Sequence, residues 1–326
     1  MNKHIARAAC VAISMLLSLA ASAQTDAPAT PGVVEKPAVK FASPERNSML
    51  AATSAGDRIV AVGDRGVILL SEDQGATYRQ AKDVPTRATL TSVTFVDDKT
   101  GWAAGHWGVI LHTQDGGETW QLQRDDLGND QPLFSVWFKD NQKGFAAGLF
   151  SLLLTTSDGG KTWEQIKLPG VGNKRADLNL FSIFPDRQGN VLLTGEQGMV
   201  YRSRDGGKSW EIMQTGAKGT LWTGRVLDDD SIVVAGLRGN IYRSADAGAS
   251  WTRIDAPSNR SITDMTQMPS GDLLLVGMDG VTLLSKDRGA TFDLQQRQDR
   301  ASLTAVVANS RGIPLFFSQS GVVKDN

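Results

Sequence analysis

A phrase of Ser or Thr, Asp, Gly and Trp recurs along this chain, and its regular spacing restricts the possible fold more than any other feature. "TQDGGETW" begins at Thr113, "TSDGGKTW" at Thr156 and "SRDGGKSW" at Ser203, with looser copies on both sides. The gaps between successive aspartates are 42, 43, 47, 41 and 41 residues. A period near 42 residues is typical of stacked supersecondary units. The aspartates are Asp73, Asp115, Asp158, Asp205, Asp246 and Asp287.

A second marker has the same period. An apolar residue lies 25 residues before each aspartate except the first, at Leu90, Leu133, Leu180, Leu221 and Ile262. Each unit divides into four short apolar runs split by Gly, Asp and Asn, which predicts four strands. Another unit begins at Leu303, and the chain ends before its Asp phrase. The sequence therefore predicts an all-β, seven-bladed β-propeller with four-stranded blades, in which an N-terminal strand at residues 36–44 completes the last blade.

The repeated phrase falls between the third and fourth predicted strands of every complete unit. Glycine supplies the positive φ that such a turn requires, and the Asp and Ser/Thr side chains can accept backbone N–H bonds within it. The aromatic residue that follows can pack against the sheet. Six equivalent catalytic sites around a ring make no mechanistic sense, so we interpret the six aspartates as structural.

The phrase resembles the Asp box of bacterial neuraminidase repeats, which occurs in sialidases, some glucanases and sortilin-like receptors. A longer pattern, L-x-S-V-x-F, G-W-A-A-G and G-V-I-x-x-T-x-D-G-G-x-T-W, fits residues 90–120 and 133–163. On this pattern the chain, over about residues 36–326, resembles the photosystem II stability/assembly factor propellers. The resemblance implies a non-enzymatic protein that binds a protein partner and assists assembly of a membrane complex. Many cyanobacterial relatives are similar to lipoproteins, and this chain departs from that pattern.

The N-terminal residues are typical of a secretory signal. Lys3 and Arg7 precede a short apolar run, and "ASA" ends at Ala23 as a cleavage site. We therefore expect a signal peptide at 1–23, a flexible leader at 24–34, a propeller at 35–326 and a periplasmic location. The run is too short for a comfortable membrane span. Cys10, the single cysteine, leaves with the signal.

Cleavage also sets the charge of the mature chain. Loss of Lys3 and Arg7 leaves 32 basic against 35 acidic residues, a net charge of −3. Such a balance favours neither nucleic acid nor an anionic membrane surface as a partner. We expect no cofactor and a monomer.

Strand order places the Asp boxes on one face of the ring and the turns after the second strands on the other. The largest insertion, "LPGVGNKRADLN" at 168–179, lies on that second face, where loops commonly carry binding residues. Arginine together with large aromatic residues is a typical composition for a protein interface. An ordinary charged rim is the alternative. The predicted partner-binding residues are Arg65, Trp107, Phe150, Arg175, Arg238, Arg260 and Arg300.

The alternative function is a carbohydrate-binding or sialidase-like glycoside hydrolase. The chain lacks the F/Y-R-I-P motif, and its three tyrosines, Tyr78, Tyr201 and Tyr242, occupy repeat positions. Hydrolysis by a glucanase mechanism needs two facing carboxylates, and Asp264 is an inner-strand acid with no obvious partner, best explained as a solvated channel residue. His106 and His112 lie at opposite ends of one strand, so no metal site is predicted.

Overall fold

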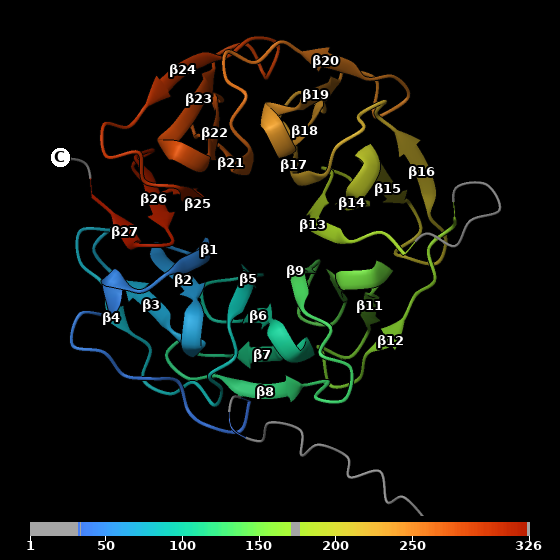
Figure 1. Cartoon of the computed structure of the whole chain (residues 1–326). Coiled ribbons are helices and arrows are strands. Elements are labelled where there is room, and N and C mark those ends of the chain that lie inside the picture. Colours follow the sequence, from blue (N-terminus) through green and yellow to red (C-terminus); the bar gives the residue numbers. More distant parts are fainter. Residues whose placement is uncertain (1–31, 33, 171–176, 325–326) are drawn as a thin grey trace, which may run out of the picture.

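The chain folds into a ring of seven antiparallel sheets around a central channel (Figure 1). This computed structural model describes residues 32, 34–170 and 177–324. Consecutive strands pair within every sheet, so each sheet is an up-and-down blade built from one sequence repeat. The predicted seven-bladed, all-β propeller is therefore confirmed. The predicted signal peptide and Arg175 lie outside the described residues.

The strands of each blade follow one another outward from the channel (Figure 1). The first, innermost strands are β1 (Met49–Ala55), β5 (Leu90–Phe95), β9 (Leu133–Phe138), β13 (Leu180–Pro185), β17 (Leu221–Val226), β21 (Ile262–Gln267) and β25 (Leu303–Ala308). The second strands are β2 (Arg58–Gly63), β6 (Gly101–Gly105), β10 (Gly144–Gly148), β14 (Val191–Gly195), β18 (Ile232–Gly236), β22 (Leu273–Gly277) and β26 (Pro314–Ser318).

The outer half of each blade is shorter. The third strands are β3 (Ile68–Ser71), β7 (Ile110–Thr113), β11 (Leu153–Thr156), β15 (Met199–Ser203), β19 (Ile241–Ser244), β23 (Val281–Ser285) and β27 (Gly321–Val323). The fourth strands are β4 (Arg79–Gln80), β8 (Gln121–Arg124), β12 (Glu164–Gln165), β16 (Glu211–Gln214), β20 (Thr252–Ile254) and β24 (Asp293–Gln296). Within the described residues, the seventh blade has three strands.

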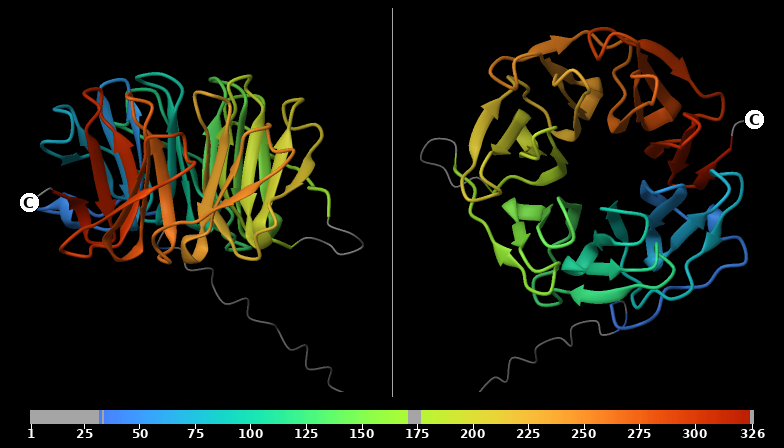
Figure 2. Two further views of the ribbon diagram at one scale, coloured as in Figure 1. Left: turned by 90° about the horizontal axis from the view of Figure 1, so that it is seen from above. Right: turned by 180° about the vertical axis from the view of Figure 1, so that it is seen from behind.

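The hydrophobic core lies between neighbouring blades. Second strands such as β6 and β18 are buried at every position, because each is covered by a blade on both sides. The apolar runs that the sequence shows as "GWAAG" and "IVVAG" are therefore the residues that hold blade to blade. In side view the strands run from one face of the ring to the other, and the connecting loops form the two faces (Figure 2).

The predicted closing strand at residues 36–44 is wrong. This segment instead follows the outer edge of blade 1, where the amide of Ala38 donates to Val84 O at 2.9 Å and Lys40 Nζ donates to Ala81 O at 2.6 Å. Val34 and Ala38 are buried there beside Val84. Pro37 and Pro44 lack the N–H groups that a sheet ladder needs, and the apolar side chains find burial against blade 1.

The ring closes by contacts between side chains and backbone of blades 7 and 1. Thr304 Oγ1 donates to Met49 O at 2.5 Å, and Asn309 Nδ2 donates to Gln74 O at 3.0 Å. Met49, Ala305 and Phe317 share one buried cluster across this seam. A short 3-10 turn, η1 (Pro44–Arg46), passes close to the edge of β27, so that a Cβ on Gly321 would lie only 2.1 Å from Glu45 O.

The Asp boxes form one recurrent turn between third and fourth strands. In the third blade Asp158 Oδ1 accepts from the Thr162 amide at 2.9 Å and from Thr156 Oγ1 at 2.8 Å, and Asp158 Oδ2 accepts from Thr162 Oγ1 at 2.7 Å. Trp163 Nε1 donates back to Gly160 O at 3.1 Å. The hydrogen bonds from Thr162, and to a smaller extent the bond from Thr156, stabilise the charged carboxylate and lower the pKa of Asp158 to about 2.

Candidate functional site

The face opposite the Asp boxes carries a 3-10 turn after the second strand of six blades. We call it the turn face, and it is the face toward the viewer in Figure 1. The middle residue of each turn has a left-handed backbone although it is not glycine, with φ between 54° and 60°. The turns are η2 (Asp64–Gly66), η3 (His106–Gly108), η4 (Leu149–Ser151), η5 (Glu196–Gly198), η6 (Leu237–Gly239) and η7 (Met278–Gly280). The middle residues are Arg65, Trp107, Phe150, Gln197, Arg238 and Asp279.

The neighbouring inter-blade link holds each turn in this conformation. The glycine that follows Arg238 could not carry a side chain, because a Cβ on Gly239 would meet Ser258 O at 2.3 Å. The amide of Arg238 in turn donates to Ser261 Oγ at 3.1 Å. Left-handed backbone disfavours large side chains by about 1–2 kcal/mol per residue. The surrounding fold therefore holds these six residues in place at a conformational cost. Four of the side chains are exposed, those of Arg65, Phe150, Gln197 and Arg238, whereas Trp107 and Asp279 are half-buried.

Blade 3 departs furthest from this pattern. Ser151 replaces the usual glycine, so Phe150 and Ser151 both have positive φ. The Phe150 amide donates to Asn179 Oδ1 at 2.9 Å, and the Ser151 amide donates to Leu178 O at 2.9 Å. Both partners belong to the insertion at 168–179. The insertion thus fixes a strained turn whose Phe150 side chain is 59% exposed.

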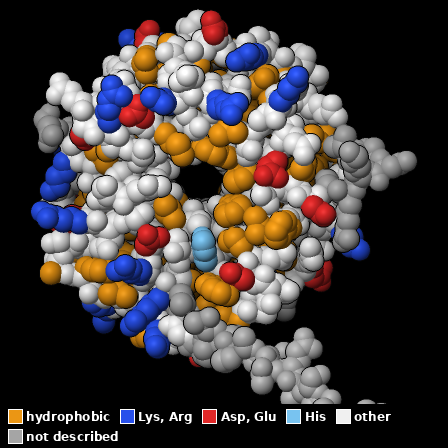
Figure 3. Space-filling model, in the orientation of Figure 1, with side chains coloured by type: hydrophobic (Ala, Val, Ile, Leu, Met, Phe, Trp, Pro, Cys, Tyr) orange, Lys and Arg blue, Asp and Glu red, His pale blue; other side chains and the backbone are white. Residues whose placement is uncertain are grey.

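Basic side chains occupy one part of the turn face. Lys and Arg gather over blades 5 to 7 and blade 1, at the top and left of Figure 3, whereas hydrophobic side chains surround the channel mouth and extend to the right. Arg260 Nε and Arg300 Nη1 each lie 3.1 Å from Asp279 Oδ2. The Arg238 side chain has no hydrogen bond or ion pair within the described part of the chain, so its guanidinium is available to a partner. Arg65 lies 6.0 Å from the centre of the Phe41 ring.

Aromatic residues at the channel mouth were missed by the sequence analysis. In blades 2, 6 and 7 the second residue of the first strand is a threonine that bonds to the next blade; Thr91 Oγ1, for example, donates to Leu133 O at 2.5 Å. Blades 3, 4 and 5 carry Phe134, Phe181 and Trp222 at this position. The rings of Phe134 and Phe181 stack at 5.3 Å between centroids. An alignment of the repeats would have revealed that blades 3, 4 and 5 carry an aromatic residue where blades 2, 6 and 7 carry the hydrogen-bonding threonine.

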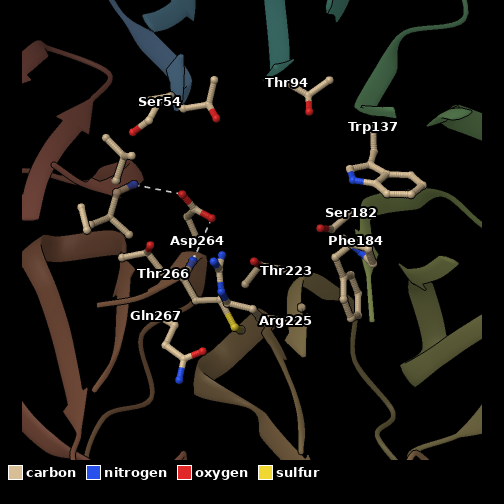
Figure 4. Close-up of a pocket in the computed structure, with 18 of the residues that line it drawn as sticks. Ser54, Thr94, Trp137, Ser182, Phe184, Thr223, Arg225, Asp264, Thr266 and Gln267 are labelled. Carbon is tan, nitrogen blue, oxygen red and sulfur yellow. Dashed lines mark hydrogen bonds between the residues drawn. The ribbon is translucent and has the colours of Figure 1, made fainter. Parts of the chain in front are cut away.

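The channel itself forms a cavity of about 730 Å³. Figure 4 shows side chains from the first strands of several blades pointing into it. Ser92 Oγ accepts from the Val136 amide at 3.0 Å, and Ser135 Oγ accepts from the Ile183 amide at 3.0 Å. Each serine therefore links its blade to the next one.

Asp264 occupies the position of these serines in blade 6. Its Oδ2 accepts from the Val306 amide of blade 7 at 2.9 Å, and its Oδ1 accepts from the Met265 amide at 2.8 Å. Burial raises the pKa of Asp264 to about 6, against the lowering effects of these two bonds and of Arg225. Asp264 thus lines the channel as expected, and the two backbone bonds are what the sequence did not reveal. Asp264 is an inter-blade link whose carboxylate faces Arg225 from blade 5 (Figure 4).

The described residues offer neither a metal-ligand cluster nor a membrane-spanning helix. No group of three or more His, Cys, Asp and Glu side chains there could hold a metal ion. His112 packs against Trp102 with 4.9 Å between ring centroids, and burial lowers its pKa. Among the residues that the structure covers, no helix is long and apolar enough to cross a membrane.

Comparison with known proteins identifies the family. The family model described as Photosynthesis system II assembly factor YCF48 matches residues 80–313. The chain belongs to this family. It is 39% identical over 149 residues to the photosystem II assembly lipoprotein Ycf48 of Picosynechococcus sp., a match that spans 44% of this chain and 42% of the relative. It is 38% identical over 146 residues to the photosystem II assembly protein Ycf48 of Thermosynechococcus vestitus, spanning 44% and 40%. The matches thus span about two fifths of these curated relatives.

Solved structures show the fold of the YCF48 family. YCF48 bound to a D1 peptide superposes with a TM-score of 0.68 at 19% identity, covering 89% of this chain and all of that one. YCF48 from Cyanidioschyzon merolae superposes with a TM-score of 0.67 at 14% identity, covering 86% and 95%. A streptogramin B lyase also superposes, with a TM-score of 0.72 at 15% identity, covering 86% and 94%. At these identities the structural likeness concerns the fold alone.

Proposed function

We propose that this protein is a non-enzymatic assembly factor that binds a segment of a membrane or envelope protein on its turn face. Membership of the YCF48 family supports the role, and a solved member of that family is bound to a D1 peptide. The observation that carries the proposal is the turn face itself. The fold exposes Phe150 and Arg238 on left-handed backbone that such residues rarely adopt, whereas Trp107, at the same position of blade 2, is half-buried against the core.

The two parts of the turn face suit different groups of a bound peptide. Arg238 presents a planar fork of N–H donors that matches a carboxylate, and it has no competing acceptor among the described residues. Phe150, Phe134 and Phe181 offer aromatic area that loses little side-chain entropy on binding. The expected partner segment therefore combines a carboxylate with apolar side chains.

The geometry of the acids in the channel supports a role without catalysis. Glycoside hydrolysis needs a pair of carboxylates free to act on the substrate. The channel lining contains Asp264 and Asp228. Both carboxylate oxygens of Asp264 accept hydrogen bonds from backbone amides, and Asp228 Oδ1 accepts from Arg288 Nε at 3.1 Å. Both carboxylates are thus engaged in structural bonds.

The proposal also includes export. The features of residues 1–23 support cleavage after Ala23 and release of a monomer into the periplasm. Mass determination of the protein recovered from a periplasmic fraction tests this, because an N-terminus at Gln24 is expected. Recovery of an intact N-terminus from the membrane fraction would contradict it.

A binding measurement with a defined peptide tests the function. The probe is the D1 peptide, and cross-linking to envelope complexes followed by mass spectrometry extends the test to natural partners. The double variant Phe150→Ala/Arg238→Ala should lose capture roughly tenfold or more, with nearly unchanged melting, because both side chains are exposed. Arg288→Ala, on the Asp-box side, is the matched control. Equal capture by the double variant would overturn the assignment of the face, as would loss of capture in the control alone.

A further inference from the structure

Arg225 of β17 is an arginine without a partner inside the channel. Its side chain has no hydrogen bond, and no carboxylate lies within 4.0 Å of it, among the residues that the structure covers. Figure 4 shows its guanidinium pointing toward Asp264. Asp264 already accepts two backbone amide bonds, so it is only a distant counter-charge. Arginine side chains within a protein are generally paired, which makes this guanidinium a candidate binding group.

Unused hydroxyl groups surround the same space. Ser92 and Ser135 accept inter-blade bonds, whereas six further hydroxyls of the lining have no hydrogen-bond partner among the described residues. Two of the six belong to buried residues, Thr223 and Thr266. The six are Thr53, Ser54, Thr94, Ser182, Thr223 and Thr266. This observation is independent of Arg225 and indicates a ligand with several hydrogen-bonding groups of its own.

One wall of the channel is aromatic. Trp137 of β9 stacks on Phe145 at 6.4 Å between centroids, and its indole remains at the edge of the channel near Phe184 (Figure 4). An indole face packs well against the C–H surface of a flat, saturated ring. The cavity volume of about 730 Å³ falls within the roughly 300–1,000 Å³ of small-molecule sites.

We propose that the channel binds a sugar acid, a small polyhydroxylated molecule with one carboxylate. Arg225 takes the carboxylate as a forked pair of charge-assisted hydrogen bonds. The free hydroxyls of Thr223, Thr266 and their neighbours bond the sugar hydroxyls, and Trp137 packs against the ring. The site is separate from the partner-binding turns, so the two activities are measured independently of one another.

Titration calorimetry of the mature chain with three probes tests the proposal. D-glucuronate carries both the carboxylate and the hydroxyls, D-glucose lacks the carboxylate, and benzoate lacks the hydroxyls. We expect D-glucuronate to bind roughly tenfold or more tightly than either of the others, since each comparator leaves one set of protein groups unpaired. No detectable D-glucuronate binding would overturn the proposal. Equal or tighter binding of benzoate would overturn the assigned ligand class.

Variants locate the site. Arg225→Gln should weaken D-glucuronate binding roughly tenfold or more, and Trp137→Ala should weaken both sugars. Arg204→Gln, an exposed arginine paired with Glu211, is the matched control and should bind as the parent does. If Arg225→Gln fails to fold, Arg225→Lys retains the charge without the fork and should still bind more weakly than the parent. Unchanged affinity in folded Arg225 variants would overturn the site.

Discussion

Replacing Asp264 by serine should stabilise the protein at neutral pH. Serine is the residue that performs the same inter-blade link in blades 2 and 3, where Ser92 and Ser135 reach the next backbone amide at 3.0 Å. Asp264→Ser should therefore keep a bond to the Val306 amide while removing a carboxylate that burial disfavours. We expect the free energy of unfolding to increase at pH 8.

The size of the effect follows from the pKa. The pKa of Asp264 rises from 3.8 to about 6 on folding, a difference of about two that corresponds to about 3 kcal/mol. The folded carboxyl binds its proton more tightly than the unfolded one, so this contribution favours folding below pH 3.8 and is lost as the pH rises through 6. The open channel and the lost attraction to Arg225 make the stabilisation by Asp264→Ser smaller than this. We therefore expect the variant to increase the free energy of unfolding by about 1–3 kcal/mol at pH 8 and by almost nothing at pH 4.

Urea denaturation followed by tryptophan fluorescence at pH 4, 5.5 and 8 measures this difference. Ser135→Ala is the matched control, because it removes an equivalent link without changing charge and should destabilise by about 1 kcal/mol at every pH. Parent and Asp264→Ser curves that stay parallel from pH 4 to 8 would refute the argument, since the carboxylate would then carry no burial cost.

Three further predictions follow from the same structure. Phe150→Gly should leave the free energy of unfolding unchanged or increase it by up to about 1 kcal/mol, because glycine tolerates left-handed backbone. Peptide capture by the same variant should fall, and reduced stability with full capture would contradict the prediction. Asp158→Ala should lower the melting temperature at pH 7 without changing capture. The native Asp158 contribution itself should fade as pH falls from about 4 through its pKa of about 2, which melting curves at pH 2–5 would show. A chain starting at Ala42 should melt at a lower temperature than one starting at Gly32, since only the shorter chain lacks Val34 and Ala38; identical melting would refute their packing role.

The fold was predictable because one turn with strict local chemistry repeats at a fixed interval. The bonds of one turn all close within eight residues: Thr156 and Thr162 donate to Asp158, and Trp163 donates to Gly160, so each copy marks the same point of a blade wherever it occurs. The count of these copies, together with the apolar residue 25 positions earlier, gives the number of blades and the order of their strands.

The closing segment and the channel site depend on contacts between distant parts of the chain. Pro37 and Pro44 disfavour a sheet strand in residues 36–44, but only the burial of Val34 and Ala38 shows that the segment packs on blade 1. Arg225 and Asp264 belong to consecutive repeats, and only the ring brings their side chains into one space. The repeats show that Asp264 stands where blades 2 and 3 have serine, but only its bond to the Val306 amide shows that the aspartate performs the same inter-blade link.

Closure of the ring by contacts between blades 7 and 1 has a consequence for how the chain matures. The Thr304–Met49 contact joins positions 255 residues apart, and confining a chain segment of that length costs about 5 kcal/mol of loop entropy. Until blade 7 is complete, the growing molecule is an open arc whose end blade exposes Met49 and Leu69, residues buried by Phe317 in the finished ring. The apolar edge of such an arc can also associate with another copy of the chain before its own last blade arrives. The seam between blades 7 and 1 is therefore where correct folding competes directly with aggregation.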